Sequence, residues 1–302
     1  MTRPTSAIEH TSRRARALAA ATATVRASYE VLNTFIDTYA RNDIGFLNDG
    51  VVTDDLGSRS SNTPLPPSAA LYELALGDCT GLDTLDVGSG RGGGAAVALG
   101  LGARRAVGVE LAFAGASAAL RENRGLAVNG DAHALGVREA SIDVVTCVES
   151  SQFYSDLPAV LREIRRILRP NGRFGYADIF LASAFPAYTT TLVAAGFTIK
   201  GVNDVTTAAV AAFARRDLTR EFHSPARAAI EQQIAGLTQL HRQLRSGRYC
   251  YVVIDARPGP PARHASPEVT RAAALVRLLA GASCRSSAAR FTPLGTDHID
   301  GR

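Results

Sequence analysis

Hydrophobic and polar positions follow two periods along the chain from residue 82 onward. Short apolar runs rich in β-branched residues predict buried strands, and apolar residues three and four positions apart predict helices. The predicted strands are 84–87, 105–110, 126–128, 142–148, 173–179, 197–202 and 249–256. The predicted helices are 95–101, 112–121, 157–168, 188–195, 206–216 and 225–244. Strands that alternate with helices in this way predict an α/β fold, with a parallel sheet covered on both faces.

Charge divides the chain into three parts. The 302 residues carry a formal net charge of +5 and are 46% hydrophobic, which suffices for a buried core. Residues 1–28 hold five Arg and one acid, 257–302 hold seven Arg and three acids, and 29–256 carry the remaining net charge of −3. We therefore predict a flexible basic N-terminal arm (1–28), one domain (29–256) and a largely disordered Pro/Arg-rich extension with a short helix (257–302). Without a basic excess on the domain, we expect no nucleic-acid partner.

Cysteine usage and the N-terminus bear on the compartment. The four cysteines form no C-x-x-C pair, and no apolar run approaches the ~20 residues of a membrane-spanning helix. Ser12-Arg13-Arg14 resembles a twin-arginine export signal, but the residues that follow are mainly Ala and Thr, and Arg26 ends the run. We expect a cytoplasmic protein without a transmembrane segment.

A glycine-rich loop follows the first predicted strand. Gly88, Gly90 and Gly93 satisfy G-x-G-x-x-G between a strand and a helix, a pattern that by itself suits a dinucleotide. Asp86 stands two positions before the first glycine, where its charge would repel a pyrophosphate on the loop. The same carboxylate suits a cationic ammonium or sulfonium group.

Two more carboxylates end the next two predicted strands. Glu110 is placed to accept hydrogen bonds from both ribose hydroxyls, and Asp131 is placed to accept one from an adenine amino group. Three carboxylates at neighbouring strand ends describe a nucleoside with a cationic tail. The sequence therefore predicts S-adenosyl-L-methionine, and not NAD, as the cofactor.

Four motifs in order make the chain similar to class I S-adenosylmethionine-dependent methyltransferases. They are Leu85–Gly93, Gly130-Asp131-Ala132, Ile142–Val145 and Leu168–Arg173. The resemblance implies a Rossmann-like seven-stranded methyltransferase sheet with helices on both faces, a helical lid and residues 249–256 as the inserted antiparallel strand. The cofactor-binding residues that it implies are Asp86, Gly88, Gly90, Gly92, Glu110, Leu111, Asp131, Ala132 and Val148.

Over residues 29–256 the chain also resembles the phthiotriolone and phenolphthiotriolone dimycocerosate methyltransferases, which O-methylate long lipid-like polyketides. The residues that carry this resemblance are Asn42–Asn48, Gly92–Ala95, Val148–Tyr154 and Gly175–Ile179. It implies methyl transfer to a hydroxyl of a hydrophobic lipid- or polyketide-type natural product, in secondary metabolism. The segment 201–244, where substrate specificity should lie, matches loosely.

Glu149, at the end of the fourth strand, is the first candidate for chemistry. It is placed to take a proton from the acceptor or to stabilise a cation, or it only fixes a loop. Geranyl diphosphate C-methyltransferases share a similar Glu-Ser-Ser-x-x-Tyr stretch, which leaves cation stabilisation open. His223 is the second candidate base. Four aromatic residues are predicted to line an acceptor pocket: Tyr39, Phe46, Tyr154 and Tyr176. No histidine pair has metal spacing, and we predict no required metal.

Three alternatives to O-methylation stay open at this point. They are C-methylation of an isoprenoid or other alkene, a cofactor-binding cyclase without methyl transfer, and a nucleic-acid methyltransferase. The last is the least favoured, because Glu149–Gln152 stands where an Asn/Asp-Pro-Pro-aromatic motif would follow the fourth strand. A homodimer is a further open expectation.

Overall fold

The computed structural model describes residues 5–39, 48, 50–52, 65–122, 124–215, 227–259 and 271. Within these ranges, seven strands form one sheet in the order β3-β2-β1-β4-β5-β7-β6. The strands are β1 Asp83–Val87, β2 Arg105–Glu110, β3 Leu126–Asn129, β4 Ile142–Val148, β5 Leu168–Leu181, β6 Phe197–Asp204 and β7 Tyr249–Pro258. Strands β1 to β5 pair in parallel, and β7 is antiparallel to both β5 and β6. This confirms the predicted sheet and its reversed last hairpin.

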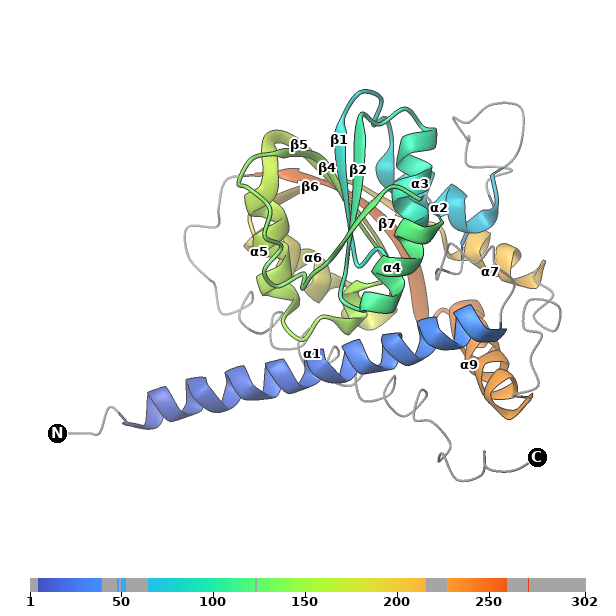
Figure 1. The fold of residues 1–302 in the computed structure, drawn as a ribbon, viewed down its shortest axis with the longest axis horizontal. Helices are drawn as coiled ribbons and strands as arrows, with labels where there is room; N and C mark the ends of the chain where they lie inside the picture. Colours follow the sequence, from blue (N-terminus) through green and yellow to red (C-terminus); the bar gives the residue numbers. More distant parts are fainter. Residues whose placement is uncertain are drawn as a thin grey trace.

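Helices cover both faces of the sheet (Figure 1). One core cluster joins α5 (Leu157–Ile167) and α6 (Phe185–Ala194) to the sheet. The other joins α2 (Pro67–Leu76), α3 (Gly93–Gly100), α7 (Thr206–Ala214) and α9 (Arg227–Arg245) to it. Helix α4 (Phe113–Arg121) packs along β2 and β3. In β4, Val145 and Cys147 belong to the first cluster and Val144 and Val148 to the second, as expected for a strand buried on both faces.

The chain reverses direction across the sheet between β1 and β4. It runs from β1 outward through β2 to β3, then returns to β4 on the other side of β1. In open α/β sheets, a crevice forms at this reversal, at the carboxyl ends of the strands, and ligands bind there. The topology therefore selects one end of β1, β2 and β4 as the place for a functional site.

Helix α1 (Thr5–Tyr39) changes the predicted division of the chain. It crosses the expected boundary at Ser28 without a break, and its C-terminal half packs against α4 (Figure 1). The Glu30 carboxylate accepts hydrogen bonds from the amides of Phe113 (2.5 Å) and Ala114 (2.9 Å) at the start of α4. Residues 5–28, expected as a flexible arm, are helical in the structure, and the Thr22 hydroxyl lies 3.1 Å from the hydroxyl of Ser155.

None of the helices in the described ranges is long and apolar enough to cross a membrane.

Candidate functional site

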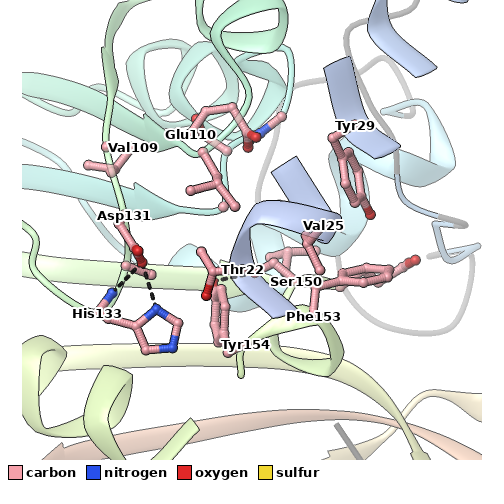
Figure 2. Close-up of a pocket in the computed structure, with 18 of the residues that line it drawn as sticks. Thr22, Val25, Tyr29, Val109, Glu110, Asp131, His133, Ser150, Phe153 and Tyr154 are labelled. Atoms are coloured by element: carbon pink, nitrogen blue, oxygen red, sulfur yellow. Dashed lines mark hydrogen bonds and ion pairs between the residues drawn. The ribbon is translucent and has the colours of Figure 1, made fainter. Parts of the chain in front are cut away.

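A cavity opens at the carboxyl ends of β1, β2 and β4, beside the reversal of the strand order. Its volume is about 860 Å³, including the open mouth. Figure 2 shows that the sheet supplies one wall, through residues such as Val109 and Asp131, and that helix α1 supplies part of another. The cavity lies where the fold places ligands, which makes it the candidate site.

The loop between β1 and α3 brings the backbone to the cavity wall. Gly88 and Gly90 line the cavity with φ angles of +74° and +53°, a region that favours glycine. A Cβ on Gly88 would lie 2.5 Å from the Cβ of Ser150, so only glycine fits. Gly92, expected to bind the cofactor, lies off the cavity wall. It is the left-handed N-cap of α3 and faces Ala119.

Asp86 lies behind this loop, near the end of β1. Its side chain is 3% exposed, and its Oδ1 accepts a hydrogen bond from the Thr146 hydroxyl (2.8 Å). The buried hydroxyl of Ser89, on the cavity wall, has no hydrogen-bond partner among the described residues. Burial raises the pKa of Asp86 to about 6, against the lowering effect of hydrogen bonds from Thr146 and Tyr72. A buried carboxylate and an unsatisfied buried hydroxyl favour a ligand that brings positive charge and hydrogen-bonding groups.

Glu110, at the end of β2, lines the cavity and organises the loops around it. Oε2 accepts a hydrogen bond from the Gly90 amide (2.9 Å), and Oε1 accepts one from the Ala112 amide (2.8 Å). Burial raises the pKa of Glu110 to about 7, although these amides lower it. Each oxygen keeps a lone pair, so the carboxylate suits a pair of hydroxyl donors such as those of a ribose. Leu111, the next residue, also lines the cavity.

Asp131 (Figure 2) and Ala132 follow β3, and both line the cavity. Hydrogen bonds from the side chain and the backbone amide of His133 lower the pKa of Asp131 below its usual value. The carboxylate is therefore ionised at neutral pH. The structure brings Gly88, Gly90, Glu110, Leu111, Asp131, Ala132 and Val148 together, as the sequence predicted.

Glu149 lines the cavity directly after β4. Its φ angle is +49°, which is unusual for a residue other than glycine and turns the chain out of the strand. The Glu149 amide donates to the carbonyl of Ala177 (2.8 Å), and its Oε1 accepts a hydrogen bond from the Tyr251 hydroxyl. Tyr251 comes from β7 and is fully buried. It lies far from Glu149 in the sequence, so the local sequence pattern does not predict this contact.

Two of the predicted pocket aromatics lie in different places. Tyr154 lines the cavity, and its hydroxyl donates to the carbonyl of Val87 (3.2 Å) at the end of β1. Tyr176 lies outside the cavity, contrary to expectation. It is 1% exposed, stacks on Phe174 at 5.5 Å and donates to the Ser151 hydroxyl (2.6 Å). It points into the core from β5, since the pleat sets its direction.

Helix α1 supplies cavity residues other than the four predicted pocket aromatics. Thr22, Val25 and Tyr29 line the cavity, and the ring of Tyr29 meets that of Phe153 edge to face at 5.2 Å (Figure 2). Thr22 and Val25 come from the segment that was expected to be an arm, so nothing in the local pattern assigns these two residues to the site, whereas Tyr29 is the first residue of the predicted domain.

Three predicted residues are beyond what the structure describes. His223 and Phe46 lie outside the described residues, and for Tyr39 only the backbone is described. In the described part of the chain, no group of three or more His, Cys, Asp or Glu could hold a metal ion. The role of His223 and the independence from metal both stay predictions.

The cavity fits a nucleoside with a cationic tail. Its acidic side chains are Glu110, Asp131 and Glu149, each at or just after the end of a different strand. A Cβ on Gly94 would lie 2.3 Å from the Asp86 carboxylate, so the glycines keep this space open. Carboxylates around a glycine loop match a sulfonium nucleoside better than a pyrophosphate.

Comparison with known proteins agrees with the fold. A family model described as a methyltransferase domain matches residues 85–175. The solved structure of the cyclopropane synthase from Mycobacterium tuberculosis is similar, with a TM-score of 0.60 and 14% identity, over 78% of this chain and 98% of that one. Residues 85–175 thus match a methyltransferase domain, within a seven-stranded sheet whose fold resembles that of this solved structure.

Two curated relatives have a higher sequence identity to the chain than this solved structure, over shorter segments. A probable phthiotriol/phenolphthiotriol dimycocerosates methyltransferase of Mycobacterium ulcerans is 37% identical over 123 residues, which is 39% of this chain and 48% of the relative. A fatty-acid O-methyltransferase of Mycolicibacterium smegmatis is 34% identical over 149 residues, 45% of this chain and 53% of the relative. The chain spans about half the length of these curated relatives.

Proposed function

We propose that this chain binds S-adenosyl-L-methionine in the cavity and transfers its methyl group to a hydroxyl of a hydrophobic small molecule. The observation that carries this proposal is the set of carboxylates at neighbouring strand ends around the glycine loop. Asp86 and Ser89 would serve the cationic end of the cofactor, Glu110 the ribose and Asp131 the adenine. The match to the methyltransferase domain model supports the same assignment.

The chain's own residues would position the reactants and move one proton. When bound, the cofactor supplies an electrophilic methyl group on a sulfonium. Glu149 would take the proton that the acceptor hydroxyl loses as its oxygen receives this methyl group. Tyr251 holds the Glu149 carboxylate from β7, so the base is fixed before the acceptor arrives.

The wall near Glu149 supports a hydrophobic acceptor. Val25, Tyr29, Val148, Phe153 and Tyr154 all line the cavity, and apolar walls with a few polar groups suit apolar ligands. The names of the two relatives, for dimycocerosates and fatty acids, point to lipid- or polyketide-type acceptors. We infer a role in the secondary metabolism of lipid- or polyketide-type compounds.

Methyl transfer from isotope-labelled S-adenosylmethionine tests the proposal. The protein is incubated with a panel of long-chain alcohols, phenolic polyketides and isoprenoid alkenes, and the products are analysed by mass spectrometry. An O-methyl ether, formed in step with S-adenosylhomocysteine, is the expected result. A C-methyl product overturns the hydroxyl target, and cofactor binding without methyl transfer to any class overturns the activity.

A further inference from the structure

His133 contacts the Asp131 carboxylate twice. Its backbone amide donates to Oδ1 (2.9 Å), and its ring nitrogen Nδ1 lies 2.6 Å from the same oxygen (Figure 2). Both contacts engage Oδ1, so Oδ2 takes part in neither. His133 therefore fixes the direction of the carboxylate by one of its oxygens.

The surroundings of the ring settle which nitrogen carries the proton. The backbone amide of Asp156 donates to Nε2 (3.2 Å), which requires a lone pair on that nitrogen. In the neutral imidazole the proton is then on Nδ1, and the ring donates to Asp131. A neutral residue at this position that lacked this donor would leave Oδ1 with the backbone contact alone.

A second chain of contacts holds the ring against α1. The Ser155 hydroxyl lies 3.2 Å from Nε2 and 3.1 Å from the hydroxyl of Thr22 on α1. The ring of Tyr154 packs edge to face against the imidazole, at 6.2 Å between ring centroids. The imidazole thus contacts Tyr154, Ser155 and Asp156, and Ser155 in turn contacts Thr22 of helix α1. A side chain held by several neighbours is suited to position another.

We infer that His133 is a positioning residue that holds Asp131 in the orientation needed to accept a hydrogen bond from the exocyclic amino group of adenine. This inference rests on the proposed cofactor. An oriented, ionised carboxylate accepts from the amino group of adenine but meets the carbonyl oxygen of hypoxanthine as a second acceptor. His133, which also lines the cavity, thereby contributes to selection of the base through Asp131.

Paired titrations of two cofactor products test the inference. Isothermal titration measures S-adenosylhomocysteine and S-inosylhomocysteine, which differ in the amino group, against the wild type and His133→Phe. We expect His133→Phe to weaken adenosyl binding by about tenfold, the loss of one hydrogen bond to a charged group, and inosyl binding by less than about twofold. His133→Asn, whose amide nitrogen replaces Nδ1, should restore most of the preference for adenosine. Asp131→Ala should abolish the preference, and adding His133→Phe to it should change nothing further.

Control measurements distinguish a failure of this inference from a failure of the proposed function. His241→Gln removes a histidine that stacks on Phe213 away from the cavity, and it should leave both affinities unchanged. Unchanged selectivity in folded His133→Phe, or an equal loss for both ligands in His133→Phe and His133→Asn, overturns the inference. Failure of the wild type to bind either ligand overturns the proposed function instead.

Discussion

Asp86 and Glu110 set the pH dependence of cofactor binding at the residue scale. Burial raises their pKa values to about 6 and about 7, so each carboxyl takes up a proton as the pH falls below its value. A sulfonium ligand and ribose hydroxyls favour the ionised forms, and binding must then release those protons. We expect the Kd of S-adenosylmethionine to rise by up to about tenfold per pH unit between about pH 7 and about pH 6, and by up to about 100-fold per unit below about pH 6, where binding releases both protons. Titrations from about pH 8 to about pH 5 check this, and a constant Kd over that range contradicts it.

Glu149 and Tyr251 make separate contributions to turnover. Glu149→Gln should lower kcat by about 100-fold or more, because the proton loses its acceptor, while S-adenosylhomocysteine affinity changes little. Tyr251→Phe removes only the hydroxyl that orients Glu149 and should lower kcat by about tenfold. Glu163→Gln is the matched control, since Glu163 pairs with Arg166 on α5 outside the cavity. Full activity of Glu149→Gln would exclude its role as the base.

The sequence predicted the cavity residues whose position follows from their place on a strand. Glu110, Asp131 and Glu149 stand at or just beyond the carboxyl ends of predicted strands, where a parallel sheet gathers them. It missed Tyr251 and Thr22, which reach the site region from segments far away in the chain. It misplaced Tyr176, because whether an aromatic on a doubly covered strand faces a cavity or the core depends on packing.

At the scale of elements, helix α3 depends on one glycine for its approach to β1. A Cβ on Gly94 would lie 2.3 Å from the Asp86 carboxylate and from the Tyr72 ring, whereas a Cβ on Gly100 would meet nothing within 4 Å. Gly94→Ala should destabilise the protein by about 2 kcal/mol and weaken cofactor binding, because overpacking displaces Asp86. Gly100→Ala, in the same helix, should be neutral or stabilise by up to about 1 kcal/mol. Chemical denaturation of both variants checks the contrast, and equal stabilities would refute it.

The strands and most helices could be predicted because their apolar positions follow a clear period. Strand β4 matches its predicted range, 142–148, since it is buried on both faces. Helix α1 was not predicted as one element. Its sequence over 5–28 is rich in Arg, Ala and Thr without a strong apolar stripe, and its packing depends on partners such as Ser155 and Phe153. Helix α2 was missed as well, because its apolar residues are nearly continuous and show no helical period.

For the whole molecule, charge and contacts give different answers about the N-terminal segment. By charge alone, both 1–28 and 257–302 are dispensable. The structure places Thr22 and Val25 on the cavity wall. The last strand in the described ranges, β7, ends at Pro258. Deletion of residues 1–28 should therefore weaken S-adenosylmethionine binding by about tenfold or more, because the site loses the part of its wall that Thr22 and Val25 supply. Deletion of residues 260–302, nearly all of which lie outside the described residues, should change it by less than about twofold. Calorimetry on both truncated chains checks this, and equal effects would contradict it.

Cofactor binding by the intact chain tests the central claim most directly. Isothermal titration with S-adenosylmethionine should show saturable binding at one site, and NAD should neither bind nor compete. Asp86→Asn should weaken the binding by about tenfold or more, because the sulfonium loses its buried counter-charge. Absence of S-adenosylmethionine binding, or tighter binding of NAD, would contradict the account.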